Sequence, residues 1–159
     1  MLRQVKSKTT SASGGYFAIV ASRYNARYVD AMVRAAAAEL KRAGVKRIQT
    51  VRVPGAFEIP AVAATLASEQ MARPSAVICL GVVFQGQTSH AEHIGWGVTH
   101  ALAQIQLQHR MPIIHGVFVF EKEEQARVRC LGRKHNRGRE AAQTALAMAS
   151  VMASLRRPA

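Results

Sequence analysis

Apolar positions along the chain follow two spacings, one typical of buried strands and the other of amphipathic helices. Short apolar runs predict strands buried on both faces of a sheet, which we expect at residues 17–21, 76–84 and 112–120. An alternating stretch predicts a further strand at 48–53. Between the strands, apolar side chains return every three or four residues, which predicts helices. The expected helices cover residues 26–43, 59–71, about 90–109, 123–131 and 139–155.

Particular residues mark where these helices begin and end. Asn25 is a natural N-cap, because an asparagine side chain accepts hydrogen bonds from first-turn N–H groups. Ser89 and Glu92 have the spacing of a capping box at the start of the third helix. Gly44 is expected to end the first helix, and Pro74 follows the second.

Strands that alternate with helices indicate βαβ units, and therefore a mostly parallel sheet with helices on both faces. We expect an α/β fold, a three-layer α/β/α sandwich around a four-stranded sheet, with residues 16–159 as a single domain. Residues 1–15 are small and polar and are expected to form a flexible arm. Ligands of such sheets bind beyond the carboxyl ends of the strands. Here those ends are residues 22–25, 53–58, 84–90 and 119 onward.

Length and composition narrow the class of protein. A chain of 159 residues fits one domain, and its 49% of apolar residues argues against disorder. No apolar run reaches the roughly 20 residues of a membrane span, and the polar N-terminus lacks a signal-peptide core. The two cysteines, Cys79 and Cys130, are too few for a disulfide framework and lack a Cys-x-x-Cys spacing. We therefore expect a cytoplasmic protein in a reducing compartment.

The formal net charge of +13 favours negatively charged partners, either nucleic acid or small anions. A solvated basic surface would give the same balance. Aromatic residues make up only 6% of the chain and do not interleave with basic ones, so nucleic acid is not the expected partner. Most of the basic segment at 127–139 reads as solvated surface, but one guanidinium there could bind a phosphate through paired hydrogen bonds.

The motif Gly86-Gln87-Thr88-Ser89-His90 places a glycine turn directly before a helix. Free N–H groups and the positive helix end make such a turn an anion site, although an ordinary capped helix begins in the same way. The motif is neither a Walker A sequence nor a dinucleotide fingerprint. His90 could exchange protons near neutral pH, or serve only as a capping or surface residue. His93 follows three residues later, a spacing that zinc pairs on helices do not favour, so no metal is expected.

The motif Val53-Pro54-Gly55-Ala56-Phe57-Glu58-Ile59-Pro60 forces a tight turn after a strand. It presents a ring at Phe57 and a carboxylate at Glu58. A flat heterocycle could stack on the ring, and the carboxylate and bare amides could hold hydroxyl groups. The alternative is a core phenylalanine with a glutamate that the helix dipole favours in the first turn.

Five sequence blocks, in this order along residues 17–155, resemble the lumazine synthase family, which acts at the penultimate step of riboflavin biosynthesis. The blocks are Ala21-Ser22-Arg23-Tyr24-Asn25, the motif at 53–60, Leu80-Gly81 through Gly86-Gln87-Thr88-Ser89-His90, Glu124-Gln125-Ala126 followed by Arg129, and Asn136-Arg137-Gly138. The second and third blocks together are very specific. The resemblance implies a flavodoxin-like fold and a condensation of 5-amino-6-(D-ribitylamino)uracil with 3,4-dihydroxy-2-butanone 4-phosphate that needs no cofactor.

The resemblance also implies roles for individual residues. Tyr24 would stack on the pyrimidine, the turn at Ala56, Phe57 and Glu58 would hold the ribityl chain, and the strand end would read the ring edge. Gln87 and Thr88 would bind the phosphate of the second substrate, Arg129 would neutralise it, and His90 would shuttle protons. The expected pyrimidine-binding residues are Tyr24, Asn25, Ala56, Phe57, Glu58, Val82, Val83 and Phe84.

In the family, each active site lies between neighbouring subunits, so His115, Arg129 and Arg137 would come from the neighbour. His115 stands where the family usually has an aromatic residue, and Arg137 where it usually has a lysine. The loop at 132–138 is one residue shorter than in capsid-forming relatives and lacks their internal glycine. We therefore expect a pentamer or decamer rather than a capsid. A non-catalytic flavin or lumazine carrier on the same scaffold remains the alternative function.

Overall fold

The computed structural model describes residues 15–156, so the predicted arm lies outside the described residues except for Gly15. Four strands form one sheet in the order β2-β1-β3-β4, and every neighbouring pair is parallel. The expected sheet is therefore confirmed and is fully rather than mostly parallel. The strands are β1 (Tyr16–Ser22), β2 (Arg47–Val53), β3 (Ala76–Phe84) and β4 (Ile113–Phe120).

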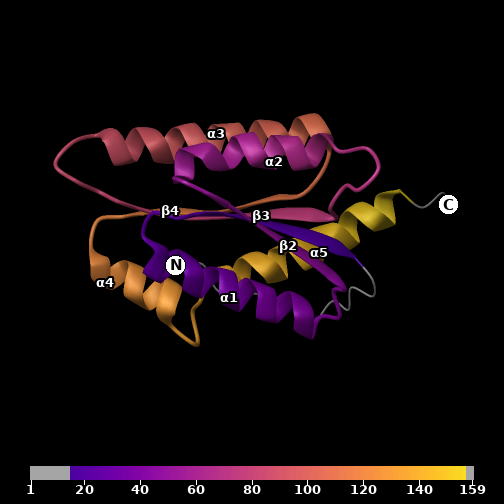
Figure 1. Ribbon diagram of the computed structural model, residues 1–159, viewed down its shortest axis with the longest axis horizontal. Helices are drawn as coiled ribbons and strands as arrows, with labels where there is room; N and C mark the ends of the chain where they lie inside the picture. Colours follow the sequence, from indigo (N-terminus) through magenta and orange to yellow (C-terminus); the bar gives the residue numbers. More distant parts are fainter. Residues whose placement is uncertain (1–14, 157–159) are drawn as a thin grey trace.

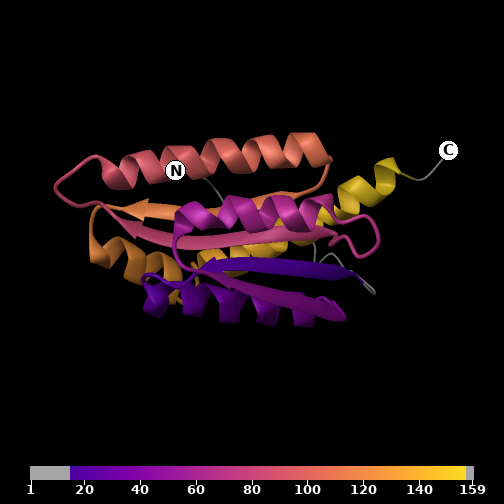
Figure 2. The same ribbon diagram turned by 45° about the horizontal axis from the view of Figure 1, so that its top comes forward.

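Helices cover both faces of the sheet, as the three-layer prediction requires (Figure 1). On one face lie α2 (Ile59–Ser68) and α3 (His90–His109), and on the other α1 (Ala26–Arg42), α4 (Glu123–Ala126) and α5 (Arg137–Leu155). Figure 2 shows the loop between β3 and α3 extending beyond one end of the sheet, where β3 ends. Across residues 15–156, no helix is both long enough and apolar enough to cross a membrane.

The core consists of two apolar clusters, one on each side of the sheet. Along β1, Phe17 and Ile19 belong to the cluster under α1 and α5, whereas Ala18 and Val20 belong to the cluster under α2 and α3. Because both faces of β1 are covered, its side chains are apolar at consecutive positions rather than alternate ones. This two-sided burial explains why the strand runs were readable from sequence.

Two of the predicted helix starts are made differently. Asn25 occupies the N-cap position of α1 but has φ 57° and makes no side-chain capping bond. Its amide Nδ2 instead donates to the Val82 carbonyl at 2.8 Å. Ser89 also makes no capping bond, because its Oγ lies 3.1 Å from His93 Nε2. The expected side-chain caps at Asn25 and Ser89 were therefore wrong.

Helix boundaries near the C-terminus also differ from those expected. The helix predicted at 123–131 is split into α4 and a π-helical turn, η2 (Arg127–Leu131). The last helix begins at Arg137 rather than residue 139, because Asn136 caps it through its side chain. Helix α2 ends at Ser68, three residues before the expected end.

Candidate active site

The carboxyl ends of β1, β2 and β3 are tied together by hydrogen bonds. The backbone N–H of Tyr24 donates to the Pro54 carbonyl at 3.1 Å, so the segment after β1 lies against the turn after β2. The bond from Asn25 to the Val82 carbonyl joins the same segment to β3. Three of the predicted sequence blocks therefore meet at the carboxyl end of the sheet, as the parallel topology requires.

Two aromatic rings are exposed at the carboxyl end of the sheet. Tyr24 is 69% exposed and Phe57 is 63% exposed, so the alternative of a core phenylalanine is wrong. A Cβ at Gly55 would lie 3.2 Å from the Tyr24 ring, and one at Gly97 of α3 would lie 3.4 Å from the Phe57 ring. The absence of side chains at these glycines lets the rings lie close to the backbone. Solvent-facing rings in this setting provide surfaces for stacking a flat heterocycle.

The turn that carries Phe57 is a short 3₁₀ helix, η1 (Ala56–Glu58). A carboxylate oxygen of Glu58, Oε2, accepts a hydrogen bond from the Gly55 N–H at 2.8 Å and closes the turn. Ala56 is buried in the cluster under α2 and α3, whereas Glu58 is exposed. Burial of Ala56 fixes the backbone of the turn, and the Glu58 carboxylate faces solvent beside the exposed rings.

Two hydrogen bonds made by Gln85 hold the loop between β3 and α3. Its backbone N–H donates to the Phe120 carbonyl at 2.8 Å, and its side-chain Nε2 donates to the Thr88 carbonyl at 2.9 Å. Gln87, Thr88 and His90 are all exposed, and His90 is the first residue of the 20-residue α3. The positive end of the helix dipole and the first-turn N–H groups therefore face solvent at this loop.

The end of β3 offers its backbone rather than its side chains. The Phe84 ring packs edge-on against Tyr28, with ring centroids 5.7 Å apart, on the α1 side of the sheet. Val82 is buried, and its carbonyl already accepts the Asn25 bond. Val83 is half-buried and packs against the opposite cluster. A ligand at the carboxyl end of β3 can therefore meet the backbone of 83 and 84.

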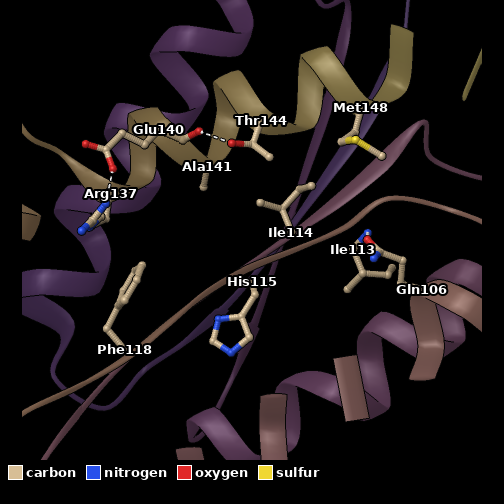
Figure 3. A pocket seen from close by; sticks show the side chains of 10 residues that line it. All are labelled: Gln106, Ile113, Ile114, His115, Phe118, Arg137, Glu140, Ala141, Thr144 and Met148. Atoms are coloured by element: carbon tan, nitrogen blue, oxygen red, sulfur yellow. Dashed lines mark hydrogen bonds and ion pairs between the residues drawn. The ribbon is translucent and has the colours of Figure 1, made fainter. Parts of the chain in front are cut away.

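A second group of predicted site residues lines a groove along β4, the edge strand of the sheet (Figure 3). The groove has a volume of about 430 Å³ and lies between α3 and α5. Its lining includes both His115 and Arg137. The lining residues are Gln106, Ile113, Ile114, His115, Phe118, Arg137, Glu140, Ala141, Thr144 and Met148. The predicted site residues at the carboxyl ends of β1, β2 and β3 form a separate strand-end group. Its members are Tyr24, Asn25, Ala56, Phe57, Glu58, Val82, Val83, Phe84, Gln87, Thr88 and His90. Among the described residues, the groove lining shares no member with this group.

His115 is fixed by a hydrogen bond to Thr99 of α3. The single Thr99 hydroxyl proton is donated to the Gly95 carbonyl at 2.7 Å. Thr99 Oγ1 also lies 2.8 Å from His115 Nε2, so the two side chains are hydrogen-bonded. Desolvation lowers the pKa of His115 below its usual 6.5, with a backbone hydrogen bond opposing the shift. The lowered pKa favours the neutral imidazole.

Arg137 and Arg129 are placed differently. The Arg137 guanidinium donates from Nη1 to Glu140 Oε2 at 2.5 Å and lies 5.7 Å above the centre of the Phe118 ring. Arg129 is exposed on η2, where the neighbouring Arg127 forms an ion pair with Glu124 at 3.3 Å. The Arg137 guanidinium is thus held by contacts within its own chain, whereas Arg129 is exposed to solvent.

Two positions of this site were not assigned a role from the sequence. Thr99 holds the His115 ring through a hydrogen bond, and Asn136 caps α5 beside Arg137. An asparagine just before a helical period is a recognisable capping signal, whereas no local pattern identifies Thr99. Within residues 15–156, no group of three metal-ligating side chains is present, and His93 is engaged with Ser89.

Comparison with known proteins adds independent evidence. Residues 14–153 match the family model described as 6,7-dimethyl-8-ribityllumazine synthase. Similar proteins of that name occur in Stenotrophomonas maltophilia strain R551-3, with 39% identity over 87% of this chain and 90% of the relative, and in Xylella fastidiosa strain 9a5c, with 40% identity over 90% and 93%. Another, from Xanthomonas campestris pv. campestris strain B100, is 41% identical over 86% of this chain and 88% of the relative. The chain therefore belongs to the 6,7-dimethyl-8-ribityllumazine synthase family of transferases in riboflavin biosynthesis.

Proposed function

We propose that the chain condenses 5-amino-6-(D-ribitylamino)uracil with 3,4-dihydroxy-2-butanone 4-phosphate at sites shared between neighbouring copies. The observation that carries this proposal is that the exposed rings of Tyr24 and Phe57 lie beside Glu58 at the carboxyl end of the sheet. A solvent-facing helix start with His90 lies beyond the next strand of the same sheet. The rings suit a flat pyrimidine, and the helix start suits a phosphate.

The reaction needs a held anion and a proton carrier. The 5-amino group attacks the ketone carbon and a water molecule leaves, giving an imine. Loss of a proton and of the phosphate, tautomerisation, and attack by the ribitylamino nitrogen with loss of a second water then give 6,7-dimethyl-8-ribityllumazine. His90 takes up and returns the protons of these steps. Holding the two substrates together supplies most of the rate, and general acid–base help adds about 10²–10⁴-fold.

One half of the site is formed by the strand-end group. Tyr24 stacks on the pyrimidine, with Asn25 fixing the segment to β3 through its bond to Val82. The backbone of Ala56 and Phe57 and the Glu58 carboxylate hold the ribityl hydroxyls, and the backbone at the end of β3 reads the ring edge. The N–H groups of Gln87 and Thr88 bind the phosphate, in keeping with their place at the start of α3.

The other half is contributed by a neighbouring copy. His115 and Arg137 line the groove along the open edge of β4, away from the strand-end group of their own chain, and Arg129 is exposed on η2. An open sheet edge with an adjoining groove suits docking of another copy. Arg129 then neutralises the phosphate bound by the first copy. We propose a ring of five copies, single or paired, acting in the cytoplasm.

The direct test is to mix purified protein with both substrates and follow the absorbance of the lumazine product. We expect product to appear only when both substrates and the protein are present, with phosphate released in equal amount. A protein that binds the pyrimidine or the lumazine without turnover would instead be a carrier, and the proposal would be wrong.

A further inference from the structure

Arg129 lies on a backbone segment that ordinary helix bonds do not fix. The segment η2 is π-helical, and it is followed by Gly132, where a Cβ would lie only 2.6 Å from the Val128 carbonyl oxygen. A π-helical turn has a different hydrogen-bond register from the α-helix that precedes it. The position of the Arg129 guanidinium therefore depends on whatever holds the end of this turn.

A buried side chain, Asn136, is hydrogen-bonded to that end. Its amide Nδ2 donates to the Cys130 carbonyl at 2.6 Å, one residue after Arg129. Asn136 is only 6% exposed, and Cys130 is fully buried, so water does not compete for this bond. Buried hydrogen bonds of this kind are costly to leave unmade.

The other end of the same amide fixes the start of α5. The Asn136 Oδ1 accepts from the N–H of Gly138 at 2.9 Å and of Arg139 at 3.3 Å. At Gly138 a Cβ would overlap the Met32 carbonyl of α1, so the first turn of α5 packs directly on the α1 backbone. Arg137 is the residue between this cap and that contact. One side chain thus joins the backbone next to Arg129 to the backbone next to Arg137.

We propose that Asn136 is a positioning residue that sets the two guanidiniums of the neighbour-facing half of the site relative to each other. This inference rests on the proposed function, in which Arg129 binds the phosphate and Arg137 lies at the same shared site. Asn136 touches neither substrate and acts only through the backbone on either side. An asparagine is required because the position needs both an N–H donor and an oxygen acceptor.

Two substitutions separate the two ends of this side chain. Asn136→Asp and Asn136→Ser both keep an oxygen that caps α5. Aspartate has no donor for the Cys130 carbonyl, and the serine hydroxyl sits on a shorter side chain than the amide that makes this bond. We expect both variants to fold and to raise the KM for the butanone phosphate by about 10- to 100-fold, because misplacements of about 1 Å carry costs of this size. The KM for the ribitylaminouracil should change much less. Gln70→Glu, at an exposed position outside the site, controls for the added negative charge of the aspartate.

A double-variant comparison tests whether Asn136 acts through Arg129. If it does, Asn136→Ser should have little further effect on the KM for the butanone phosphate in an Arg129→Ala background. Additive effects, or an equal rise in KM for both substrates, would overturn the inference.

Hydrogen exchange gives a readout that needs no activity. In Asn136→Ser, amides of residues 127–132 should exchange faster while those of α5 beyond its first turn stay protected. Unchanged exchange at 127–132 would contradict the proposal that Asn136 holds this turn through the Cys130 carbonyl, even if the wild-type protein formed no lumazine. Failure of the proposed function and failure of this inference therefore give different results.

Discussion

At the scale of single residues, the proposed site assigns phosphate binding and proton transfer to different groups. Arg129 is exposed and carries its charge on η2, whereas its neighbour Arg127 is already paired with Glu124. His90 stands at the helix start with its backbone N–H 3.4 Å from the Thr88 hydroxyl. The two roles can therefore be tested independently.

Arg129→Ala should mainly weaken binding of the butanone phosphate, because it removes a charged hydrogen-bond partner worth about 1.5–3 kcal/mol. We expect its KM to rise roughly 10- to 150-fold, with the pyrimidine KM nearly unchanged, in steady-state assays that vary each substrate in turn. Arg127→Ala, two residues away on the same turn, is the matched control. A rise in the pyrimidine KM alone would show that Arg129 has been assigned to the wrong substrate.

His115 should make stability depend on pH. Its pKa is lowered in the folded chain, so between that pKa and the unfolded value of 6.5 the unfolded chain binds more protons. Stability from this group is complete above pH 6.5 and falls as the pH drops through that window. We expect Tm measured between about pH 7.5 and 5 to fall less in His115→Gln than in the wild type. Parallel pH profiles for the two proteins would contradict the lowered pKa.

At the scale of elements, local rules predicted the strands well and the helix starts poorly. The run at 76–84 was recognisable because the strand is covered on both faces. The capping rule failed at Asn25 because its amide reaches the Val82 carbonyl, 57 positions away, a partner that no local pattern reveals. The link from Thr99 to His115 was invisible for the same reason, since it joins α3 to β4. Three of the motif blocks, in contrast, follow β1, β2 and β3, whose carboxyl ends meet because the topology is parallel.

The role of Asn25 gives a sharp test at this scale. Aspartate is as good an N-cap as asparagine and also tolerates a positive φ, but it has no N–H to donate to Val82. We expect Asn25→Asp to lower the free energy of unfolding by about 1–3 kcal/mol, measured by denaturant titration. Ser89→Ala, at a position that makes no capping bond, should change it by less than about 0.5 kcal/mol. An unaffected Asn25→Asp protein would mean that Asn25 is an ordinary cap.

At the scale of the whole molecule, the two groups of predicted site residues lie on different parts of one chain. The strand-end group lies at the carboxyl ends of the strands, whereas His115 and Arg137 line the groove along β4. We propose a head-to-tail arrangement of copies that closes into a ring, in which each copy presents its groove to the strand ends of the next. The high positive charge, +13 per chain, opposes further packing of rings at low salt.

The assembly can be weighed directly. We expect light scattering at moderate salt to give a mass of five or ten times the 17.3 kDa chain. The shorter 132–138 loop, without the internal glycine of capsid-forming relatives, is the basis for preferring these forms. A dominant particle of roughly a megadalton would contradict this expectation and indicate a closed shell of rings.

Mixing two defective chains shows whether a neighbouring copy completes the lumazine-forming site. His90→Ala damages the strand-end half, and Arg129→Ala damages the half proposed to come from the neighbour. Co-expressed in equal amounts, the two chains should rebuild intact sites at about a quarter of the interfaces of a head-to-tail ring. At low butanone phosphate, lumazine formation by the mixture should therefore reach roughly that fraction of wild-type activity, far above either variant alone. Activity no greater than the average of the two separate variants would show that His90 and Arg129 serve a site within one chain.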